Sequence, residues 1–330
     1  MTNNNFQDIE YQIFAALIQI KGIGYQTLYN FIKNENSLKS ILQTNNIDEL
    51  NKLLGRHINS DFLIGNLWED CLKNLLKTGQ EYIQFLRTKN IQLLLYTDNA
   101  FPNFPKNMKN PVFWLFVQGK IENLHNQFIL ALVGSREYTN IGKFLTETLL
   151  YGISNTDKPF VTISGLAAGI DQLVHTLSLY LHIPTIAVLG NGLLQNYPEN
   201  SHYLRTRILE NDGTIISEYF PNSKPTQNSF IHRNRIQAAL ANVITPLEWK
   251  IKSGTAHTVK FAYEMNKKII CVETPICQNY YLAHALANED AEKRYSAKKY
   301  IFPNDINLFI KEIQNNDTIT NYPTQMSFKI

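Results

Sequence analysis

The chain has 330 residues, of which 44% are hydrophobic and 18% are charged, and its formal net charge is +3. This length favours two domains, and the composition is that of a soluble globular protein. No apolar run is long enough to span a membrane, and the polar residues 1–5 do not resemble the start of a signal peptide. We therefore expect a cytoplasmic protein without a membrane partner.

The three cysteines, Cys71, Cys271 and Cys277, are odd in number and lack the paired spacing of a metal site. They indicate a reducing compartment and argue against a disulfide framework or a zinc site. The first strand of the α/β pattern described below is not followed by the glycine signature of a dinucleotide site. We therefore expect neither a metal nor a cofactor.

Residues 1–90 have the apolar spacing of helices. Two helical stretches, 11–20 and 27–32, flank the turn Lys21-Gly22-Ile23-Gly24, and further helical patterns continue to residue 89. Helix, Gly-x-Gly turn and helix make a helix-hairpin-helix pattern, whose backbone N–H groups can hold a DNA phosphate without reading sequence. The same glycines can also serve only as a turn between two packed helices. We predict a small helical (helix-hairpin-helix or SAM-like) domain over 1–90.

Residues 91–126 are predicted to join this domain to the next. Extended apolar runs at 91–96 and 112–117 flank a segment that contains three prolines. Proline fixes its own backbone and restricts the residue before it, so this segment is expected to be an extended link.

From residue 127, apolar strands and helical stretches alternate regularly. The six clearest predicted strands are 128–133, 160–164, 185–189, 214–217, 243–247 and 268–272. Since the first five each precede a helical stretch, we predict right-handed βαβ units in a Rossmann-like α/β fold with a doubly wound, mostly parallel sheet. A strand at 298–302 and a helix at 305–313 complete this domain, which we place at 127–314. The polar residues 315–330 are predicted to be a flexible tail.

The residues that follow these strands are the best candidates for a binding site, because ligands of such sheets bind beyond the carboxyl ends of the strands. In 160–171 an apolar strand turns through two glycines into a helix, so that free N–H groups and the helix dipole can meet a phosphate. Other strand ends also carry glycines, hydroxyls and cations. The predicted phosphate-binding residues are Gly134, Ser135, Arg136, Ser164, Gly165, Gly169, Arg233, Asn234, Arg235, Lys252, Ser253 and Gly254.

Positive charge is concentrated in one part of the sequence. Residues 224–268 contain eight Lys or Arg and two Glu, a net charge of +6, so the remainder of the chain carries −3. Such a segment is typical of a surface that binds a polyanion, although a solvated lysine-rich face has the same composition.

The strand-end motifs, taken in order, resemble those of the DNA-processing protein A (DprA/Smf) family. They are Val133-Gly134-Ser135-Arg136, Ser164-Gly165-Leu166-Ala167-x-Gly169-Ile170-Asp171, Tyr197-Pro198-x-Asn200, Ser217-Glu218, Arg233-Asn234-Arg235-Ile236 and Lys252-Ser253-Gly254-Thr255. The resemblance implies a dimerising Rossmann-like domain that binds single-stranded DNA through phosphates. It further implies a mediator that helps to load a RecA-type recombinase during DNA uptake and transformation, with no catalytic reaction.

The sequence departs from the family pattern at several places. Phe220-Pro221-Asn222 replaces a Pro-Pro-Gly motif, Ala238-Ala239-Leu240-Ala241 replaces Ala-Gly-Leu-Ser, and the region after Pro275 has no recognisable counterpart. We expect no winged-helix domain after this region. The resemblance therefore implies a retained DNA pocket, while the surfaces for the recombinase and the homodimer fall in the divergent region.

Individual roles follow from the motifs. Arg136 is expected to bind a phosphate bidentately through its guanidinium. The alternative is a salt bridge to a neighbouring loop. Of Arg233 and Arg235, one is expected to meet DNA and the other to order the Ser217-Glu218 loop. Phe230 or Tyr197 can supply a stacking platform for bases.

Asp171 and His175 are four residues apart on one predicted helix face. They could form an acid/base pair, but ordinary structural hydrogen bonds explain them better.

Two other functions use the same sheet. A phosphoribohydrolase of the cytokinin-activating (LOG-like) group needs a Pro-Gly-Gly-x-Gly-Thr loop closely followed by a glutamate. Here the loop is Lys252-Ser253-Gly254-Thr255 and the first acid after it is Glu264. A nucleotide sensor would bind a small ligand instead of a strand. We predict a non-enzymatic single-stranded DNA-binding protein of the DprA type.

Overall fold

The computed structural model describes residues 7–58, 65, 67–279 and 282–315. It divides into two compact units: residues 1–99 with 113–116, and residues 100–112 with 117–330. The domain limits expected from the sequence, at residues 90 and 126, stay predictions, and the expected tail lies outside the described residues except for Asn315.

The first unit is helical. Its elements are α1 (Gln7–Leu17), α2 (Tyr25–Lys33), the 3-10 helix η1 (Leu38–Gln43), α3 (Ile47–Leu54), α4 (Trp68–Thr88) and the strand β1 (Gln92–Leu95). Its core contains packed aromatic side chains, with the rings of Phe14 and Trp114 tilted by 53° and their centroids 5.1 Å apart. α1 and α4 approach closely at Gly79, where a Cβ atom would lie 1.8 Å from the carbonyl oxygen of Gln12. The glycine-containing turn between α1 and α2 is present, and whether it contacts DNA stays a prediction.

The second unit alternates strands and helices, as the sequence predicts. Its strands are β3 (Ile129–Val133), β4 (Val161–Ser164), β5 (Thr185–Val188), β6 (Thr214–Ser217), β7 (Val243–Pro246), β8 (Lys268–Glu273) and β9 (Lys298–Ile301). Its α-helices are α5 (Asn140–Ser154), α6 (Ile170–Tyr180), α7 (His202–Glu210), α8 (Gln227–Leu240), α9 (Gly254–Glu264), α10 (Pro275–Asn279), α11 (Ala283–Tyr295) and α12 (Ile306–Gln314). The 3-10 helices η3 (Ile121–His125) and η4 (Glu199–Ser201) lie in its connections, and β2 (Trp114–Gly119) contributes residues to both units.

The sheet has nine strands in the order β1-β2-β6-β5-β4-β3-β7-β8-β9. From β6 to β9 each neighbouring pair is parallel. The chain runs outward from β3 through β4 and β5 to β6, then returns to the centre and runs the other way from β7 to β9. The order therefore reverses between β3 and β7, which are paired with each other. This is the topological switch point of a doubly wound fold, and the crevice beyond it is where such sheets bind ligands.

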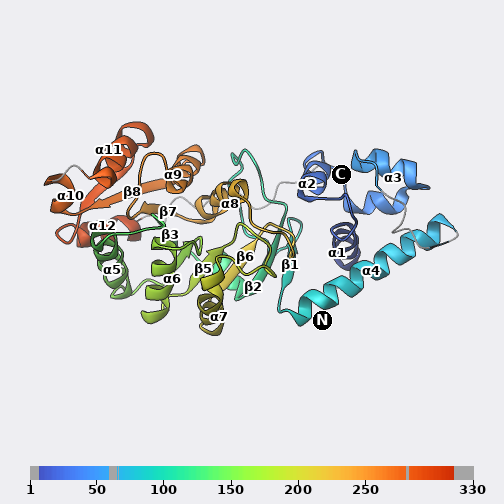
Figure 1. The fold of residues 1–330 in the computed structure, drawn as a ribbon, viewed down its shortest axis with the longest axis horizontal. Helices are drawn as coiled ribbons and strands as arrows, with labels where there is room; N and C mark the ends of the chain where they lie inside the picture. Colours follow the sequence, from blue (N-terminus) through green and yellow to red (C-terminus); the bar gives the residue numbers. More distant parts are fainter. Residues whose placement is uncertain (1–6, 59–64, 66, 280–281, 316–330) are drawn as a thin grey trace. The chain divides into compact units, whose positions relative to one another are not determined.

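Helices cover both faces of this sheet (Figure 1). α5, α6 and α7 lie on one face, and α8, α9 and α11 lie on the other. The strands between them are apolar on both sides because both sides are buried, as in other parallel sheets. Leu130, Leu132 and Val272 point into the core with α5 and α6, where Leu149 and Val174 meet them.

The main difference from the sequence-based prediction lies after Pro275. There α11 forms a regular helix of 13 residues whose buried face consists of small or polar side chains, including Ala287 and Asn288. Among the described residues no helix is both long and apolar enough to cross a membrane.

Candidate functional site

A pocket of about 1070 Å³ opens at the switch point. One wall is the segment after β3, with Gly134, Ser135 and Arg136, and the opposite wall is the segment 251–258 after β7. One face of α8 forms a third wall, since Phe230, Asn234 and Gln237 follow each other at helical spacing. The sequence motifs after two distant strands thus meet at one place.

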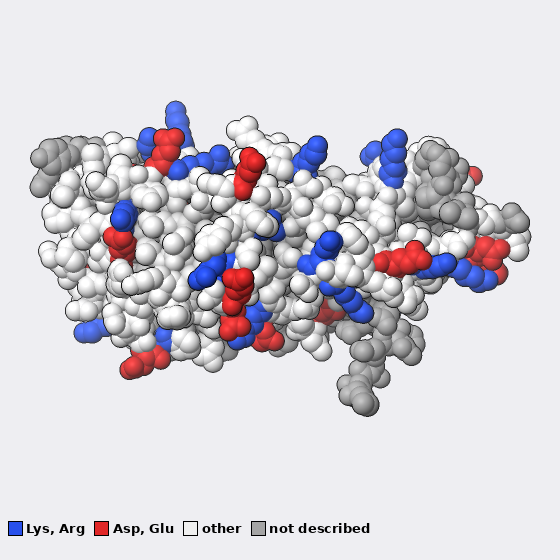
Figure 2. Space-filling model, turned by 60° about the horizontal axis from the view of Figure 1, so that its bottom comes forward, with Lys and Arg blue, Asp and Glu red and all other residues white. Residues whose placement is uncertain are grey.

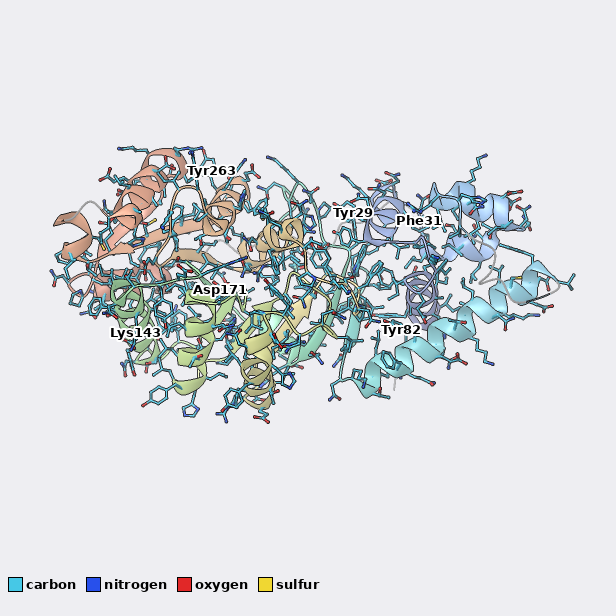
Figure 3. All side chains as sticks on the ribbon, viewed as in Figure 1. Tyr29, Phe31, Tyr82, Lys143, Asp171 and Tyr263 are labelled. Atoms are coloured by element: carbon cyan, nitrogen blue, oxygen red, sulfur yellow. The ribbon has the colours of Figure 1, made fainter. Side chains whose placement is uncertain are left out.

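The pocket is electropositive. The described residues that line it include five Lys or Arg and a single acid; the cations are Arg136, Arg233, Lys252, Lys260 and Arg294, and the acid is Asp171. Asp171 lies inside the second unit, whereas Lys143 and Tyr263 lie at its surface (Figure 3). A concave site of one sign concentrates the field, so the pocket attracts anions.

The charge of segment 224–268 is less exposed than its sequence suggests. Arg235 is buried, Lys268 pairs with Glu312, and burial lowers the pKa of Lys267 to about 8. On the face drawn in Figure 2, basic and acidic side chains are interspersed. Part of the positive charge of this segment is therefore buried or paired, while Lys252 and Lys260 are exposed and line the pocket.

Arg136 projects from a loop that its neighbours hold in place. The Ser135 amide donates to the Glu248 carbonyl oxygen at 2.6 Å, and the Ile170 amide donates to the Ser135 carbonyl oxygen at 3.0 Å. Gly169 has a φ of +91°, and a Cβ there would lie 2.4 Å from the Arg136 carbonyl oxygen. Only glycine permits this close approach. Arg136 itself is exposed and has no ion-pair partner within the described parts of the chain; its guanidinium lies 5.7 Å from the Phe230 ring centroid.

Ser164 and Gly165 support the site from beneath instead of lining the pocket. Ser164 is fully buried and its hydroxyl donates to the Leu132 carbonyl oxygen at 2.7 Å. The Gly165 amide donates to Asp171 Oδ2 at 3.2 Å, so this N–H is not available to a ligand. Residues 160–171 were predicted to cradle a second phosphate through these groups. Because the Ser164 hydroxyl and the Gly165 N–H already donate hydrogen bonds within the protein, we do not retain this prediction. Gly169 likewise acts by packing against the Arg136 loop.

Arg233 is buried below the pocket. Its guanidinium donates to the Val188 carbonyl oxygen and lies directly against Gly165, where a Cβ would overlap it. Burial lowers the pKa of Arg233 to about 10, so the side chain stays charged at neutral pH. Burial also raises the pKa of Asp171, and the charge of Arg233 opposes that rise. Arg233 is thus a fixed cation at the pocket floor, with the buried Asp171 as its opposing charge.

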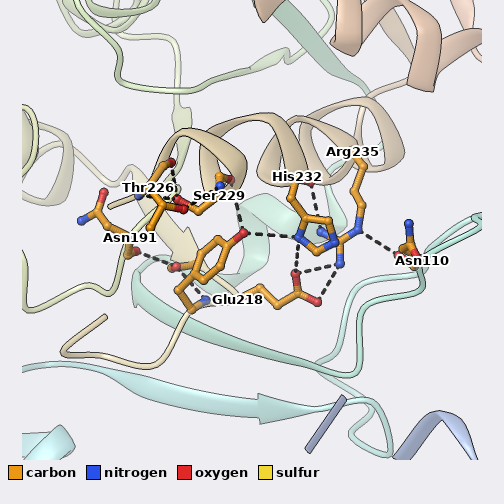
Figure 4. A network of polar contacts seen from close by, with 9 residues as sticks. Asn110, Asn191, Glu218, Thr226, Ser229, His232 and Arg235 are labelled. Carbon is orange, nitrogen blue, oxygen red and sulfur yellow. Dashed lines mark hydrogen bonds and ion pairs between the residues drawn. The ribbon is translucent and has the colours of Figure 1, made fainter. Parts of the chain in front are cut away.

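Arg235 does not reach the pocket. It is 1% exposed and forms a two-pronged ion pair with Glu218, at 2.8 and 2.7 Å, while its Nε donates to the Asn110 carbonyl oxygen at 2.9 Å. Figure 4 shows this network, in which His232 also lies 3.9 Å from Glu218. Direct DNA contact by Arg235 is therefore contradicted, because its donors are used to fix the loop after β6. Of the two arginines, Arg235 is the one that orders the Ser217-Glu218 loop.

The loop after β7 leads into α9 at the pocket rim. Ser253 caps α9 by accepting a hydrogen bond from the Ala256 backbone amide at 3.4 Å, and a Cβ on Gly254 would meet no atom within 4 Å. Lys252 is exposed beside it. The two walls are joined where Thr255 donates to the Gly134 carbonyl oxygen at 3.1 Å. The side-chain amide of Asn234 donates through Nδ2 to the Gly254 carbonyl oxygen, also at 3.1 Å. Asn234 therefore positions this loop.

Asp171 and His175 do not form an acid/base pair. The carboxylate of Asp171 accepts the hydrogen bond of Gly165, and His175 Nδ1 lies 2.7 Å from Thr185 Oγ1. Burial lowers the pKa of His175 to about 3, so the ring is neutral. Both side chains therefore have structural partners, as the sequence analysis favours.

Several residues that line the pocket lie outside the motifs identified in the sequence. Lys260 follows Ser253 and His257 on one face of α9, so its helical spacing could have indicated it. Arg294 and Tyr295 come from the end of α11, a helix that the sequence did not predict. Gln237 lies one turn after Asn234 on α8, and nothing in its local sequence distinguishes it from a core residue.

Comparison with protein families gives a specific match. The model of a family described as DNA recombination-mediator protein A covers residues 92–302, which is more than half of the chain. A curated relative, Protein Smf of Synechocystis sp., is 32% identical over 211 residues, which are 63% of this chain and 52% of that protein. DNA processing protein DprA of Streptococcus pneumoniae is 33% identical over 175 residues, or 53% and 60% of the two chains. The chain thus spans about half the length of the curated relatives it matches.

Solved structures share the fold. DNA processing protein A from Streptococcus pneumoniae aligns with a TM-score of 0.64 at 22% identity, over 93% of this chain and 98% of that one. A structure concerned with the single-stranded DNA binding mode of DNA processing protein A from Helicobacter pylori aligns with a TM-score of 0.56 at 26% identity. It covers 67% of this chain and 96% of that chain.

Proposed function

Because the chain belongs to the family of the DNA recombination-mediator protein A, we propose that it binds single-stranded DNA in the switch-point pocket and acts as a recombination mediator. The observation that carries this proposal is the pocket itself, which lies at the ligand-binding edge of the sheet with five cations and one acid in its lining. A polyanion is the ligand that such a lining favours.

The phosphates are proposed to bind at the mouth of the pocket. Arg136 is exposed and charged, and its backbone loop is held in place by its neighbours. Its planar guanidinium can therefore bind a phosphate through two hydrogen bonds. Lys252 and the open backbone at Gly254 face it from the start of α9, where helix amide groups and the helix dipole favour negative charge. Ser135 and Ser253 stand beside these groups in the two rims.

Bases are proposed to stack on an aromatic pair at the same mouth. The rings of Tyr197 and Phe230 lie 5.2 Å apart at an angle of 31°, and Tyr197 is 39% exposed. Arg136 lies over Phe230, so a phosphate contact and a stacking surface adjoin each other. This combination suits an unpaired strand, whose bases are free to leave one another.

We further propose that the chain passes the strand to a RecA-type recombinase during DNA uptake and that it works as a homodimer. Family membership supports these proposals. They are tested by recombinase filament assembly on DNA coated with a single-strand binding protein, and by sedimentation of the chain with and without an oligonucleotide. A monomer that accelerates no assembly would refute them while leaving strand binding intact.

A nucleotide sensor remains the competing function, since a pocket of this size also accommodates one nucleotide. Titration with oligonucleotides of increasing length separates the two. A strand site predicts affinity that rises over several nucleotides, and that weakens with salt by a slope of roughly −0.7 per phosphate contact on a log–log plot. Affinity that is already complete with a mononucleotide, or tight binding without salt dependence, would contradict the strand site.

A further inference from the structure

The inner end of the pocket differs chemically from its mouth. Cations at the mouth, such as Arg136, Lys252 and Lys260, are exposed. Further in, the lining side chains Val133, Gln237 and Thr258 are 4%, 1% and 1% exposed and carry no charge, and the buried charges of Arg233 and Asp171 are opposite in sign and interact with each other. A ligand that fits both ends is therefore anionic at one end and neutral at the other.

Gln237 has an unused hydrogen-bonding group at this inner end. Its Nε2 is buried and has no hydrogen-bond partner among the residues that the structure describes. Its neighbours are different, because Asn234 donates to the Gly254 carbonyl oxygen and Thr255 donates to the Gly134 carbonyl oxygen. A buried amide without a partner is costly, and a native structure that keeps one calls for a reason. The terminal torsion of glutamine is soft, so either amide atom can turn toward the pocket.

We propose that the inner end receives the base of one nucleotide of the bound strand and that Gln237 hydrogen-bonds the edge of that base. This inference rests on the proposed strand binding. A phosphate there would lose its hydration at a high cost, because Asp171 opposes the one buried cation of the lining, Arg233. A base, in contrast, is planar and uncharged and carries donors and acceptors on its edge. The phosphates on either side of this nucleotide stay at the mouth with Arg136 and Lys252.

The consequence is base preference. Phosphate contacts carry no sequence information, but a glutamine amide presents a donor beside an acceptor and distinguishes bases by their edge pattern. Gln237 is thus a specificity-determining residue in a protein whose other proposed contacts are indifferent to sequence.

The test compares Gln237→Leu with the wild-type chain. Affinities are measured at one salt concentration for oligothymidine, oligocytidine and oligoadenine of equal length and for an abasic strand of that length. For the wild type we expect the three base-bearing strands to differ by roughly tenfold, with the abasic strand weakest. Gln237→Leu should compress the three to within about twofold of one another and leave the salt slope unchanged.

A stability measurement separates this role from a structural one. Because the amide nitrogen has no partner, its removal should leave the melting temperature equal or higher. Gln172→Leu is the matched control: its amide donates to the Leu166 carbonyl oxygen and to Asn200 Oδ1, it does not line the pocket, and its loss should leave base preference intact. Gln237→Met, which keeps an unbranched side chain, repeats the test should leucine disturb the packing.

Each outcome has a definite meaning. Failure of the wild-type chain to bind any strand would overturn the proposed function, and this inference with it. Binding that is equal for the abasic strand and all three base-bearing strands would overturn the base site alone. Retention of the full spread of affinities in Gln237→Leu and Gln237→Met would also overturn it, by showing that another group reads the base.

Discussion

Replacement of Arg136 by alanine is the most direct test of the pocket. The side chain is exposed, and its guanidinium lies 5.7 Å from the Phe230 ring centroid. A charged hydrogen bond to a phosphate contributes about 1.5–3 kcal/mol, which corresponds to roughly a tenfold to hundredfold loss of affinity in Arg136→Ala. The loss should be the same for all sequences, and the salt slope should fall by about 0.7 as one phosphate contact is removed.

This change should have little effect on the stability of the folded state. An exposed cation–π contact is worth about 0.5–1 kcal/mol, so the free energy of unfolding should fall by no more than that. Arg207→Ala removes an exposed arginine on α7 that does not line the pocket, and it should leave both affinity and stability unchanged. Fluorescence anisotropy with a labelled oligonucleotide and urea unfolding of the same preparations provide the measurements. Unchanged affinity together with lost stability in Arg136→Ala would refute the site and show that the side chain only ties loops together.

Three further outcomes follow from the structure. Glu218→Ala leaves the guanidinium of Arg235 buried without its carboxylate, so urea unfolding should show a loss of about 3–5 kcal/mol. Burial lowers the pKa of His175 to about 3 and of His284 to about 4, so below pH 6.5 the unfolded chain binds protons that the folded chain does not. The contribution of these two rings to stability should thus be constant above that pH and fall as the pH is lowered toward 4, by roughly 1.4 kcal/mol per pH unit for each ring. Purified protein should release no free base from nucleoside monophosphates, because Glu264 ends α9 about 15 Å along the helix from the pocket loop.

Controls make these outcomes decisive. Glu210→Ala removes an exposed glutamate and should cost little, so an equal loss in both variants would argue against a special role for the buried pair. His175→Gln should reduce the slope of the unfolding free energy against pH by the equivalent of one proton. His182 is exposed, so His182→Gln should leave this slope unchanged. Base release that a change at His257 or Glu264 abolishes would establish a hydrolase and displace the proposed function.

Strand positions followed closely from the sequence because each buried parallel strand is a short apolar run between turn residues. The run predicted at 243–247, for example, is strand Val243–Pro246. α11 was not foreseen because its buried face is built from alanine, histidine and asparagine instead of large apolar side chains. There the helix is stabilised by tertiary hydrogen bonds, such as that of Trp249 Nε1 to Asn288 Oδ1 at 2.7 Å, which local sequence does not reveal.

The location of the site was predictable, but the direction of individual side chains was not. Gly134–Arg136 and Lys252–Gly254 meet because the carboxyl ends of adjacent parallel strands meet at one edge. Ser164 and Arg235 belong to the same motifs, yet they turn inward to the Leu132 carbonyl oxygen and to Glu218. Those partners come from other strand ends, so only the folded chain shows that the donors are already used.

The reversal of strand order between β3 and β7 has a thermodynamic consequence. The two rims of the pocket belong to segments that become neighbours only when β7 pairs with β3, so the unfolded chain has no such site. An oligonucleotide is then also a folding ligand, and at a hundred times its Kd it should add about 2.7 kcal/mol to the free energy of unfolding. A thermal melt recorded at several oligonucleotide concentrations would accordingly report affinity, with the assembly of the sheet as its signal.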